Sequence, residues 1–305
     1  MNALNGKIKY LLGIDGGGTK TEFLLTDLNG NEIKRVILGA SNPINIGIEN
    51  AKSVLLNGIS GICEGINPAE ISAFAGIAGG GSESMRALIT ECMCSVGFGA
   101  FGNGSDADNA LQAALNGENG VAVIMGTGIV AFSSLNGVLH RTGGWGYMID
   151  KGGSGFCYGS DALDSAFKAV DGRGGSKILL SLIEAMIGKP VRESLSDIYA
   201  GGAVYVASFA PAVFEAYKKG DKDAEIIIDR NAREAAKIIR TAYDFLGKEN
   251  GKAVICGGLC RQQDILKPFL LKYLGTDFPL EFSENPNIFG AVSLAKTLIG
   301  VNKHA

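Results

Sequence analysis

Histidine is nearly absent from this sequence of 305 residues, which contains only His140 and His304, and its six cysteines lack zinc-finger spacing. A structural zinc site needs four Cys or His ligands at short, regular intervals, so the pattern argues against a zinc protein. In a chain of this length such cysteines are typical of reduced core thiols in a cytosolic protein, with binding of a metal or cluster as the open alternative. They are Cys63, Cys92, Cys94, Cys157, Cys256 and Cys260.

The sequence also has no large excess of either charge and no long apolar run. The net charge is −3 and both signs are mixed along the chain, so no basic stripe attracts nucleic acid and no polybasic segment attracts a membrane. No apolar run reaches the roughly 18 residues that a membrane-spanning helix needs. The first ten residues lead directly into a strand and lack the apolar region of a signal peptide. We therefore expect a cytoplasmic protein that binds neither nucleic acid nor membranes.

Glycine, in contrast, is abundant: there are 45 residues, about twice the usual share of roughly 7%. Many of them stand in short runs between apolar segments, which is typical of tight turns and of backbone that a ligand approaches closely. Hydrophobic residues make up 46% of the chain, enough to form well-buried cores. A chain of this length is expected to form two domains.

Two stretches of the chain share one layout of strand, glycine turn, strand, Asn-Gly hairpin and strand. The glycine turns are Asp15–Thr19 and Gly126–Gly128, and the hairpins are Asn29-Gly30 and Asn136-Gly137. A unit that recurs after roughly 110 residues indicates two related lobes. The strands are expected at 9–14, 21–28 and 32–38 in the first stretch, and at 121–125, 129–135 and 138–142 in the second.

Helical periodicity follows each of these stretches, and further buried strands are expected at 71–78 and 253–256. Strands that alternate with helices predict an α/β fold with duplicated mixed sheets flanked by helices. The polar, glycine-rich break near 116–120 divides the chain into a first lobe, 1–118, and a second lobe, 119–305, with extra helices. Helices are expected at 49–62, 84–96, 106–115, 160–171, 176–187, 191–200, 204–218, 224–246 and 286–299.

The first glycine turn follows a buried strand and has few side chains. Its backbone N–H groups are able to approach phosphate oxygens closely, and Thr19 adds a hydroxyl donor. The turn leads into another strand, and its spacing fits neither a Walker P-loop nor a dinucleotide-binding Gly-x-Gly-x-x-Gly. A tight hairpin without function is the plain alternative. The second turn, Gly126-Thr127-Gly128, stands in the equivalent place and favours phosphate binding by both.

These two hairpins and the later turn Cys256-Gly257-Gly258-Leu259 resemble the superfamily of actin, hexokinase and heat-shock chaperone ATPases. More narrowly, the sequence resembles the N-acetylglucosamine kinase branch of the BadF/BadG/BcrA/BcrD ATPase family. The resemblance implies a two-lobed actin-like (ribonuclease H-like) fold and ATP-dependent phosphorylation of an amino sugar, N-acetylglucosamine to its 6-phosphate. The matching segments occur in family order over nearly the whole chain: Gly13–Thr21, Ser41–Pro43, Ser105–Ala107, Met125–Gly128 and Gly143–Gly146.

The resemblance also implies which residues bind ATP and its metal ion. Asp15 would hold Mg²⁺ through water, because Mg²⁺ keeps much of its hydration shell. The alternative is a turn aspartate that satisfies its own backbone. Adenosine would lie against Gly257 and Gly258. The ATP phosphates would contact Gly16, Gly17, Gly18, Thr19, Lys20, Gly126, Thr127 and Gly128.

Asp106 has the implied role of general base, accepting the proton of the attacking sugar hydroxyl. A carboxylate at this position has a simpler explanation as well, because Asp is a favoured N-cap for the helix expected at 106–115. Ser105 and Asp108 compete with Asp106 for both roles.

The implied sugar contacts are spread over several loops. Asn42 precedes Pro43 and is expected to be extended, with an Asx-turn as the alternative. Trp145, the only tryptophan, stands among glycines and is either open to a ligand or part of the core. The usual family run Gly-Asp-Glu-Gly-Ser is replaced by Asp150–Ser154, in which Asp150 takes the place of the aspartate after a one-residue shift and no glutamate is present. The implied set is Asn42, Asp106, Thr127, Gly144, Trp145, Gly146 and Asp150.

Other functions fit parts of the pattern. One is the ATP-driven activator of 2-hydroxyacyl-CoA dehydratases, which holds a bridging iron–sulfur cluster; here Cys157 is the only cysteine near the expected region. Others are a glucosamine or other hexose kinase and a non-catalytic ATP- or sugar-binding protein. Asp106 and the Trp145 segment favour a sugar kinase that uses Mg²⁺ and ATP. We expect a homodimer, the commonest assembly of such enzymes.

Overall fold

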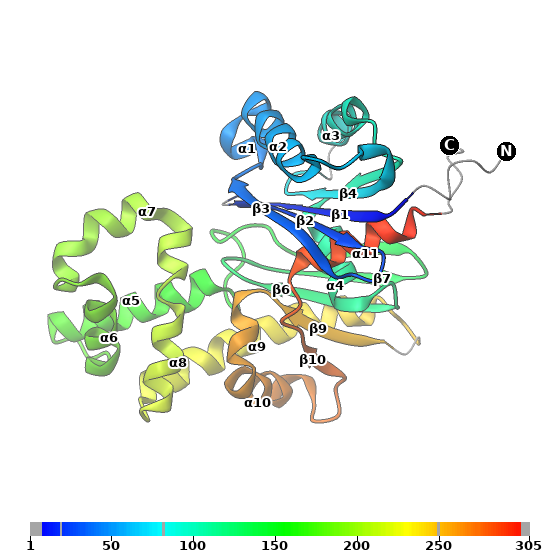
Figure 1. The fold of residues 1–305 in the computed structure, drawn as a ribbon. Helices are drawn as coiled ribbons and strands as arrows, with labels where there is room; N and C mark the ends of the chain where they lie inside the picture. Colours follow the sequence, from blue (N-terminus) through cyan, green and yellow to red (C-terminus); the bar gives the residue numbers. More distant parts are fainter. Residues whose placement is uncertain (1–7, 19, 81–82, 249–250, 300–305) are drawn as a thin grey trace. The chain divides into compact units, whose positions relative to one another are not determined.

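A computed structural model describes residues 8–18, 20–80, 83–248 and 251–299. The chain divides into two compact units: unit 1 contains the residues up to Gly117 and those from Asn285 onward, and unit 2 contains Glu118–Glu284. Each unit has one five-stranded mixed sheet with helices packed on it (Figure 1).

The sheet of unit 1 has the strand order β3-β2-β1-β4-β5. The first three strands in the chain form an antiparallel meander, and β4 and β5 add to it in parallel with β1. All seven residues of β4 are buried, as expected for a strand covered on both faces. The strands are β1 (Tyr10–Gly16), β2 (Lys20–Asp27), β3 (Glu32–Gly39), β4 (Ile71–Ile77) and β5 (Ala100–Gly104).

The sheet of unit 2 repeats this plan with the order β10-β9-β6-β7-β8. Again the first three strands are antiparallel, and the fourth and fifth are parallel to the first. The prediction of duplicated mixed sheets is therefore confirmed. The strands are β6 (Gly120–Met125), β7 (Ile129–Leu135), β8 (Val138–Gly143), β9 (Lys252–Cys256) and β10 (Leu280–Phe282).

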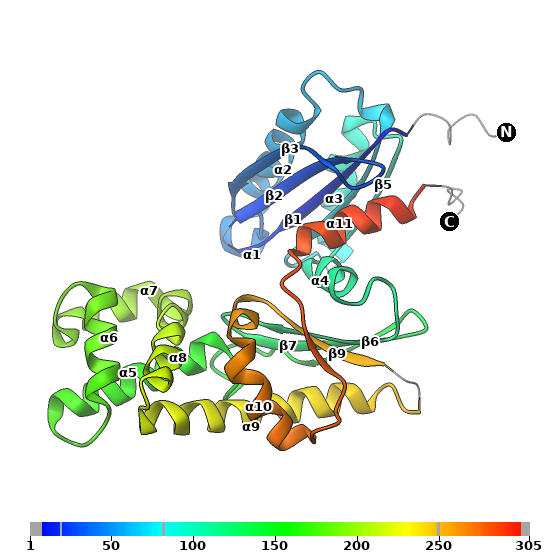
Figure 2. The same cartoon turned by 60° about the horizontal axis from the view of Figure 1, so that its bottom comes forward.

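Helices cover both faces of the sheet in unit 1 (Figure 2). On one face, Leu12 and Ile14 of β1 form a core with α2 and α3. On the other face, Leu11 contacts α11, which packs on α4. This alternation follows from the two-residue period of a strand. The helices are α1 (Pro43–Ile46), α2 (Ile48–Cys63), α3 (Glu83–Val96), α4 (Asp106–Leu115) and α11 (Asn287–Thr297).

The C-terminal helix differs from the expected lobe ranges, which placed all of 119–305 in the second lobe. Gly13 of β1 leaves room for α11, because a Cβ added there would lie 2.8 Å from Val292 Cγ2 and from Ile288 O. Ser72 Oγ donates to Ala295 O at 2.7 Å. The helix therefore belongs to unit 1, and tertiary packing rather than chain order decides its place.

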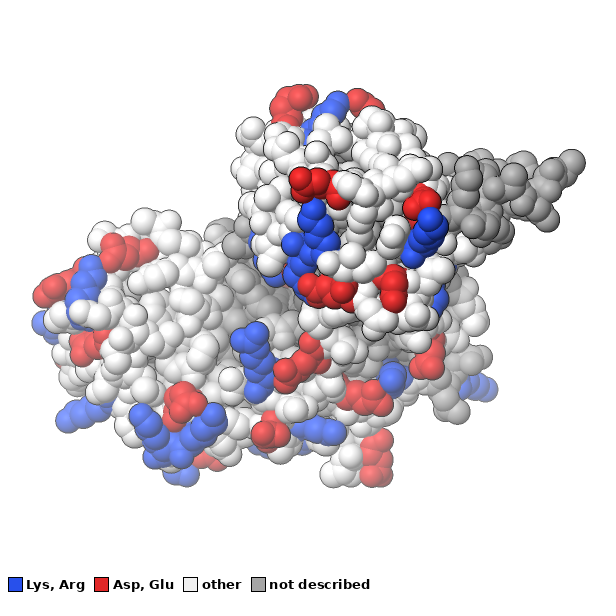
Figure 3. Space-filling model, in the orientation of Figure 1, with Lys and Arg blue, Asp and Glu red and all other residues white. Residues whose placement is uncertain are grey.

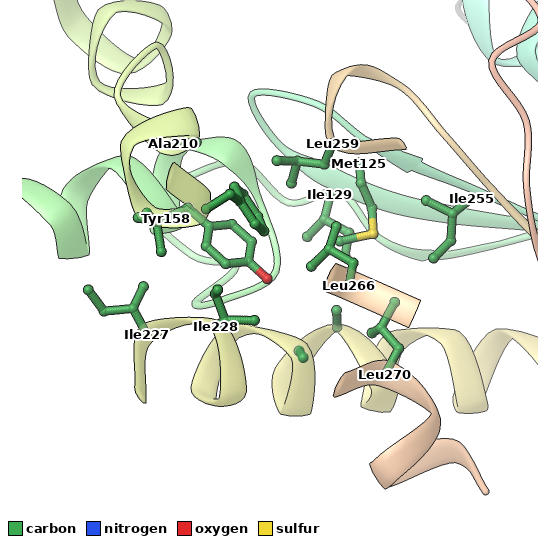
Figure 4. Close-up of a cluster of buried hydrophobic side chains, with 14 of the residues drawn as sticks. Met125, Ile129, Tyr158, Ala210, Ile227, Ile228, Ile255, Leu259, Leu266 and Leu270 are labelled. Atoms are coloured by element: carbon green, nitrogen blue, oxygen red, sulfur yellow. The ribbon is translucent and has the colours of Figure 1, made fainter. Parts of the chain in front are cut away.

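In unit 2 the long helix α9 (Lys222–Asp244) covers strands β6, β7 and β8. Tyr158, Ile228 and Leu266 form one continuous core with Ile129 and Ile255 of the sheet, and Figure 4 shows this cluster in close-up. The other helices are α5 (Gly155–Asp171), α6 (Lys177–Ile187), α7 (Leu195–Ala207), α8 (Ala210–Lys218) and α10 (Gln263–Leu274), with short 3₁₀ turns at Pro68–Glu70, Val191–Ser194 and Gly258–Gln262.

No single helix within the described ranges is long and apolar enough to cross a membrane; Val191–Ala207 and Ala210–Lys218 meet that criterion only as a pair bent by 64°. Acidic and basic side chains are interspersed over the face drawn in Figure 3. Most described ion pairs have at least one solvent-exposed partner, and in Lys168–Asp164, at 2.6 Å, both are exposed. Pairs of this kind contribute only about 0–1 kcal/mol each, so burial of the apolar cores stabilises the two units.

Two glycines on α2 provide a matched test of this packing. A Cβ on Gly58 would lie 2.1 Å from the Phe23 ring, whereas a Cβ on Gly61 would meet nothing closer than Val36 at 3.7 Å. Gly58→Ala is expected to lower the free energy of unfolding by about 1–3 kcal/mol through overpacking. Gly61→Ala is expected to raise it by about 0.5–1 kcal/mol, because alanine favours the helix. Denaturant unfolding followed by far-UV circular dichroism measures both, and a Gly58→Ala protein as stable as the native chain contradicts the packing.

Candidate active site

The first glycine turn of unit 1 is tightly packed against a neighbouring segment. A Cβ on Gly16 would lie 2.3 Å from Ser41 Oγ and 2.6 Å from Ile77, so this glycine is required by packing. Gly17 N–H donates to Lys20 O at 2.9 Å and closes the hairpin. Gly17 O accepts from the N–H groups of Ser41 at 3.1 Å and Asn42 at 3.3 Å, which brings the predicted sugar residue Asn42 to the turn.

The remaining predicted residues of this turn have different environments. Gly18 is exposed, and a Cβ there would lie 3.0 Å from Asn45 Nδ2. Lys20 Nζ donates to Glu22 at 2.8 Å, so its charge is already paired. Thr19 lies outside the described residues.

Asp15 stands at the end of β1 and is partly buried. Asn109 of α4 donates its Nδ2 to Asp15 Oδ1 at 2.8 Å and also contacts the carbonyl oxygens of Ile14 and Gly76 at 3.2 Å. Loss of solvation raises the pKa of Asp15 to about 6, against the lowering effect of the Asn109 hydrogen bond, and the carboxylates of Asp106 and Glu22 raise it further.

Asp106 is the first residue of α4, and it does not cap this helix. Ser105 is the N-cap residue, and its N–H and Oγ donate to Asp108 Oδ2 at 2.7 and 2.9 Å in a capping box. Asp106 Oδ1 instead accepts from the backbone N–H of Ala107, at 3.1 Å. Loss of solvation raises the pKa of Asp106. Backbone hydrogen bonds to its carboxylate lower this pKa, and the nearby charge of Asp108 raises it. The Asp106 side chain is therefore open to solvent at its own surface, while the protein packed around it raises the affinity of its carboxylate for a proton.

The second glycine turn, in unit 2, connects β6 to β7 and is tied to the start of α5. Gly126 N–H donates to Gly128 O at 2.9 Å, Gly155 N–H donates to Gly126 O at 2.7 Å, and Phe156 N–H donates to Thr127 O at 3.1 Å. Apart from their own chain neighbours, no atom of the described residues lies within 4 Å of a Cβ added to Gly126 or Gly128. Packing therefore does not require these two glycines, and the turn is open on that side.

The same turn lines a cavity of about 280 Å³. This cavity joins three predicted phosphate-binding residues with three predicted sugar-binding residues of the Gly143–Asp150 loop. It is lined by Gly126, Thr127, Gly128, Gly144, Gly146 and Asp150, together with Ile124, Ile129, Val130, Tyr147 and Ser154.

Trp145 does not line this cavity, and it is not a core residue, because 65% of its surface is exposed. The backbone N–H of Trp145 donates to Asp150 Oδ2 at 2.6 Å, and the Arg141 guanidinium lies 4.9 Å from the Trp145 ring centroid. Arg141 was not predicted as a site residue, because nothing in the sequence indicates which loop atoms its side chain reaches.

The late glycine turn also lies at the second hairpin. A Cβ on Gly257 would lie 2.7 Å from Met125 O, the residue before Gly126, and the backbone φ of Gly257 is +93°. Gly257 is thus required by close packing. Gly258 has no neighbour within 4 Å of an added Cβ and is open, as Gly126 and Gly128 are.

A second cavity of unit 2, of about 480 Å³, shares Tyr147 with the first and contains three cations and two carboxylates. Asp161 is paired with Arg230 and accepts from Asn231 Nδ2 at 2.8 Å. Glu234 is paired with Lys237 at 2.8 Å. Lys151 forms no ion pair with the residues that the structure describes and supplies an uncompensated charge.

The six cysteines are free thiols. Within the described ranges no group of three or more Cys, His, Asp or Glu side chains is arranged to hold a metal ion. Cys157 is half-buried, and its Sγ accepts from Gly152 N–H at 3.0 Å.

Residues 12–280 match the model of the BadF/BadG/BcrA/BcrD ATPase family. The chain belongs to this family. The match covers far more than half of the 305 residues and confirms the resemblance carried by the sequence motifs.

Two curated relatives of this family member match over most of their lengths. An N-acetylmuramic acid/N-acetylglucosamine kinase from Clostridium acetobutylicum is 30% identical over 305 residues, covering 95% of this chain and 99% of the relative. An N-acetyl-D-glucosamine kinase from Dictyostelium discoideum is 28% identical over 293 residues, covering 89% of this chain and 92% of the relative.

Solved structures share the fold. A candidate N-acetylglucosamine kinase from Chromobacterium violaceum has a TM-score of 0.73 at 24% identity, with 95% of this chain and 99% of that chain covered. A ROK family glucokinase from Streptomyces griseus, in complex with glucose and AMPPNP, has a TM-score of 0.61 at 15% identity over 95% and 99% of the two chains. The expected actin-like ATPase fold is thereby confirmed.

The raised pKa of Asp15 predicts a pH-dependent stability in metal-free buffer. The pKa of Asp15 is about 6 in the folded state, above the ordinary value of 3.8. Protonation of Asp15 therefore contributes to the free energy of unfolding fully below pH 3.8, and this contribution is lost as pH rises through 6. Asp15→Asn removes the charge, so the variant should be more stable than the native chain at pH 8 by up to about 3 kcal/mol, with the difference vanishing near pH 4. Thermal unfolding at both pH values measures this. A variant that is less stable at pH 8 would falsify the assigned desolvation.

Proposed function

We propose that this chain, an ATP-dependent sugar kinase by its family and its kinase relatives, phosphorylates an amino sugar, N-acetylglucosamine, at its 6-hydroxyl. The observation that carries the proposal is the pair of carboxylates on one end of the unit 1 sheet. Asp106 is free of the capping role, and Asn109 on the same helix holds Asp15.

In this proposal Asp106 is the general base. Its carboxylate accepts the proton of the 6-hydroxyl while the sugar oxygen bonds to the γ-phosphorus of ATP and the bond from that phosphorus to the β,γ-bridging oxygen breaks. ADP leaves with the bridging oxygen. The raised pKa of Asp106 supports this role, because a general base is most effective when its pKa lies close to the pH at which the enzyme works.

The open glycines support phosphate binding by the second hairpin and a ligand at the late glycine turn. Gly126, Gly128 and Gly258 have no packing reason to lack a side chain, so a close ligand explains them. We assign the phosphates to Gly16–Lys20 and Gly126–Gly128, with adenosine at Gly257-Gly258. We assign the sugar to Asn42, Asp106, Thr127, Gly144, Trp145, Gly146 and Asp150.

Asp15 fits a site for Mg²⁺. Its Oδ1 is held by Asn109, and a single carboxylate suffices for an ion that is otherwise bound by phosphates and water. Mg²⁺, when bound, neutralises charge on the β- and γ-phosphates. We further propose a cytoplasmic homodimer.

A coupled ADP-release assay with Mg·ATP tests the substrate, using N-acetylglucosamine, glucosamine, glucose and N-acetylmannosamine. Turnover that requires N-acetylglucosamine supports the proposal. ATP hydrolysis independent of every sugar, together with bound iron, would instead indicate the dehydratase activator.

Asp106→Asn is expected to lower kcat by about 10²–10⁴-fold while ATP binding is kept, because the variant loses only the proton acceptor. Asp164→Asn, an exposed surface carboxylate paired with Lys168, is the isosteric control and should retain activity. Near-native kcat in Asp106→Asn, measured in the same assay, removes Asp106 from the role of base.

A second candidate substrate is an N-acetylhexosamine that carries a carboxylate, such as N-acetylmuramic acid. The uncompensated charge of Lys151 in the 480 Å³ cavity favours it, and one relative is named for that sugar. Lys151→Gln is then expected to reduce kcat/KM for N-acetylmuramic acid about tenfold, the order of one charge-assisted contact, and to leave N-acetylglucosamine unchanged. Lys168→Gln is the control. A kcat/KM for N-acetylmuramic acid in Lys151→Gln that equals that of the native chain argues against a carboxylate site.

A further inference from the structure

The loop from Gly143 to Asp150 carries four of the proposed sugar contacts and is rich in glycine. Glycine loses more backbone freedom on ordering than any other residue, so such a loop binds a ligand well only if other groups hold it. Two charged side chains of opposite sign contact it, Arg141 from β8 and Asp150 from its own end.

Arg141 contacts the loop in two ways, through N–H hydrogen bonds and through a contact between its guanidinium group and an aromatic ring. Its Nε donates to Gly143 O at 3.0 Å, its Nη2 donates to Gly144 O, and its guanidinium lies 4.9 Å from the Trp145 ring centroid, within the range of a cation–π contact. No carboxylate within the described ranges forms a salt bridge with Arg141, so its charge acts on the loop alone. A planar fork of donors suits two neighbouring carbonyl groups better than an ammonium does.

Asp150 contacts the other side of the same peptide group. The oxygen of the Gly144–Trp145 peptide faces the Arg141 cation, and its N–H donates to Asp150 Oδ2 at 2.6 Å. Turning this peptide over would bring its oxygen to the carboxylate and its N–H to the guanidinium. Both contacts would then be repulsive, so the two charges allow one orientation only.

We propose that Arg141 is a positioning residue that, with Asp150, fixes the Gly144–Trp145 peptide and the Trp145 ring before the sugar binds. The inference rests on the proposed function, in which this loop contacts the sugar. Arg141 itself does not line the 280 Å³ cavity and acts through the loop. A loop held in its binding conformation loses less entropy when the ligand arrives, so Arg141 should govern sugar affinity more than turnover.

Trp145 is the only tryptophan, so its fluorescence reports on this loop alone. Arg141→Met removes the donors and the charge but keeps an unbranched stem, and Arg141→Lys keeps the charge without the fork. Arg173→Met is the control, since Arg173 is exposed and paired with Asp171. Acrylamide quenching of Trp145 is measured without ligands, and KM for the sugar and for ATP is measured in the coupled assay.

We expect stronger quenching and a rise of about tenfold in the sugar KM for Arg141→Met, the order of one lost charge-assisted hydrogen bond. The ATP KM should stay within about twofold, Arg141→Lys should lie between Arg141→Met and the native chain, and Arg173→Met should match the native chain. Unchanged quenching in Arg141→Met, or equal rises in both KM values, overturns the inference. If no sugar is phosphorylated by the native chain, the proposed function fails, while the quenching comparison still decides whether Arg141 holds the loop.

Discussion

The side-chain amide of Asn109 is fully buried and donates to three oxygen atoms on two strands of unit 1 at once. It holds Asp15 at the end of β1, and it contacts the backbone of β1 and β4 from a helix that begins with Asp106. Asp106 and Asn109 are three residues apart and share one face of α4, so the amide fixes the helix and the two carboxylates together. A shift of α4 would move the proposed base and release the Asp15 side chain in the same motion.

Five glycines of the three turns fall into two physical groups, and the division bears on function. Gly16 and Gly257 lack a side chain because neighbouring atoms leave no room for one. At Gly126, Gly128 and Gly258 the space beside the Cα atom is open, so packing within the described residues does not explain the missing side chain. Abundance of glycine in the sequence does not separate these groups, since both occur in turns with the same local pattern. Only the neighbours in space distinguish a packing glycine from one that a ligand explains.

Much of the architecture could be predicted from local patterns. Alternating apolar strands and the Asn-Gly pair at Asn136 predicted the repeated meanders, and Asn136 indeed has a positive φ of 51°. Strand β5 is not among the strands expected from the sequence, because Gly-Asn-Gly at its end is typical of turns; it pairs with β4 all the same. Helix α10 was not predicted, since Pro268 stands inside it.

The contacts of the site were harder to predict than its motifs. Arg141 and Lys151 are ordinary surface residues in the sequence, and their roles depend on which loop or cavity they meet. The contact between Asp15 and Asn109 spans 94 positions and has no local signal. Helix α11 was assigned to the second lobe from chain order, although its apolar face completes the core of unit 1.

The central claim is that phosphate passes from ATP to an amino sugar and not to water. ATP labelled at its γ-phosphate tests it most directly, with the products separated after incubation with and without N-acetylglucosamine. The account predicts one labelled phosphate group in the sugar phosphate for each ADP formed, and almost no labelled inorganic phosphate when the sugar is left out. Label that appears chiefly as inorganic phosphate at the same rate with or without the sugar would contradict it.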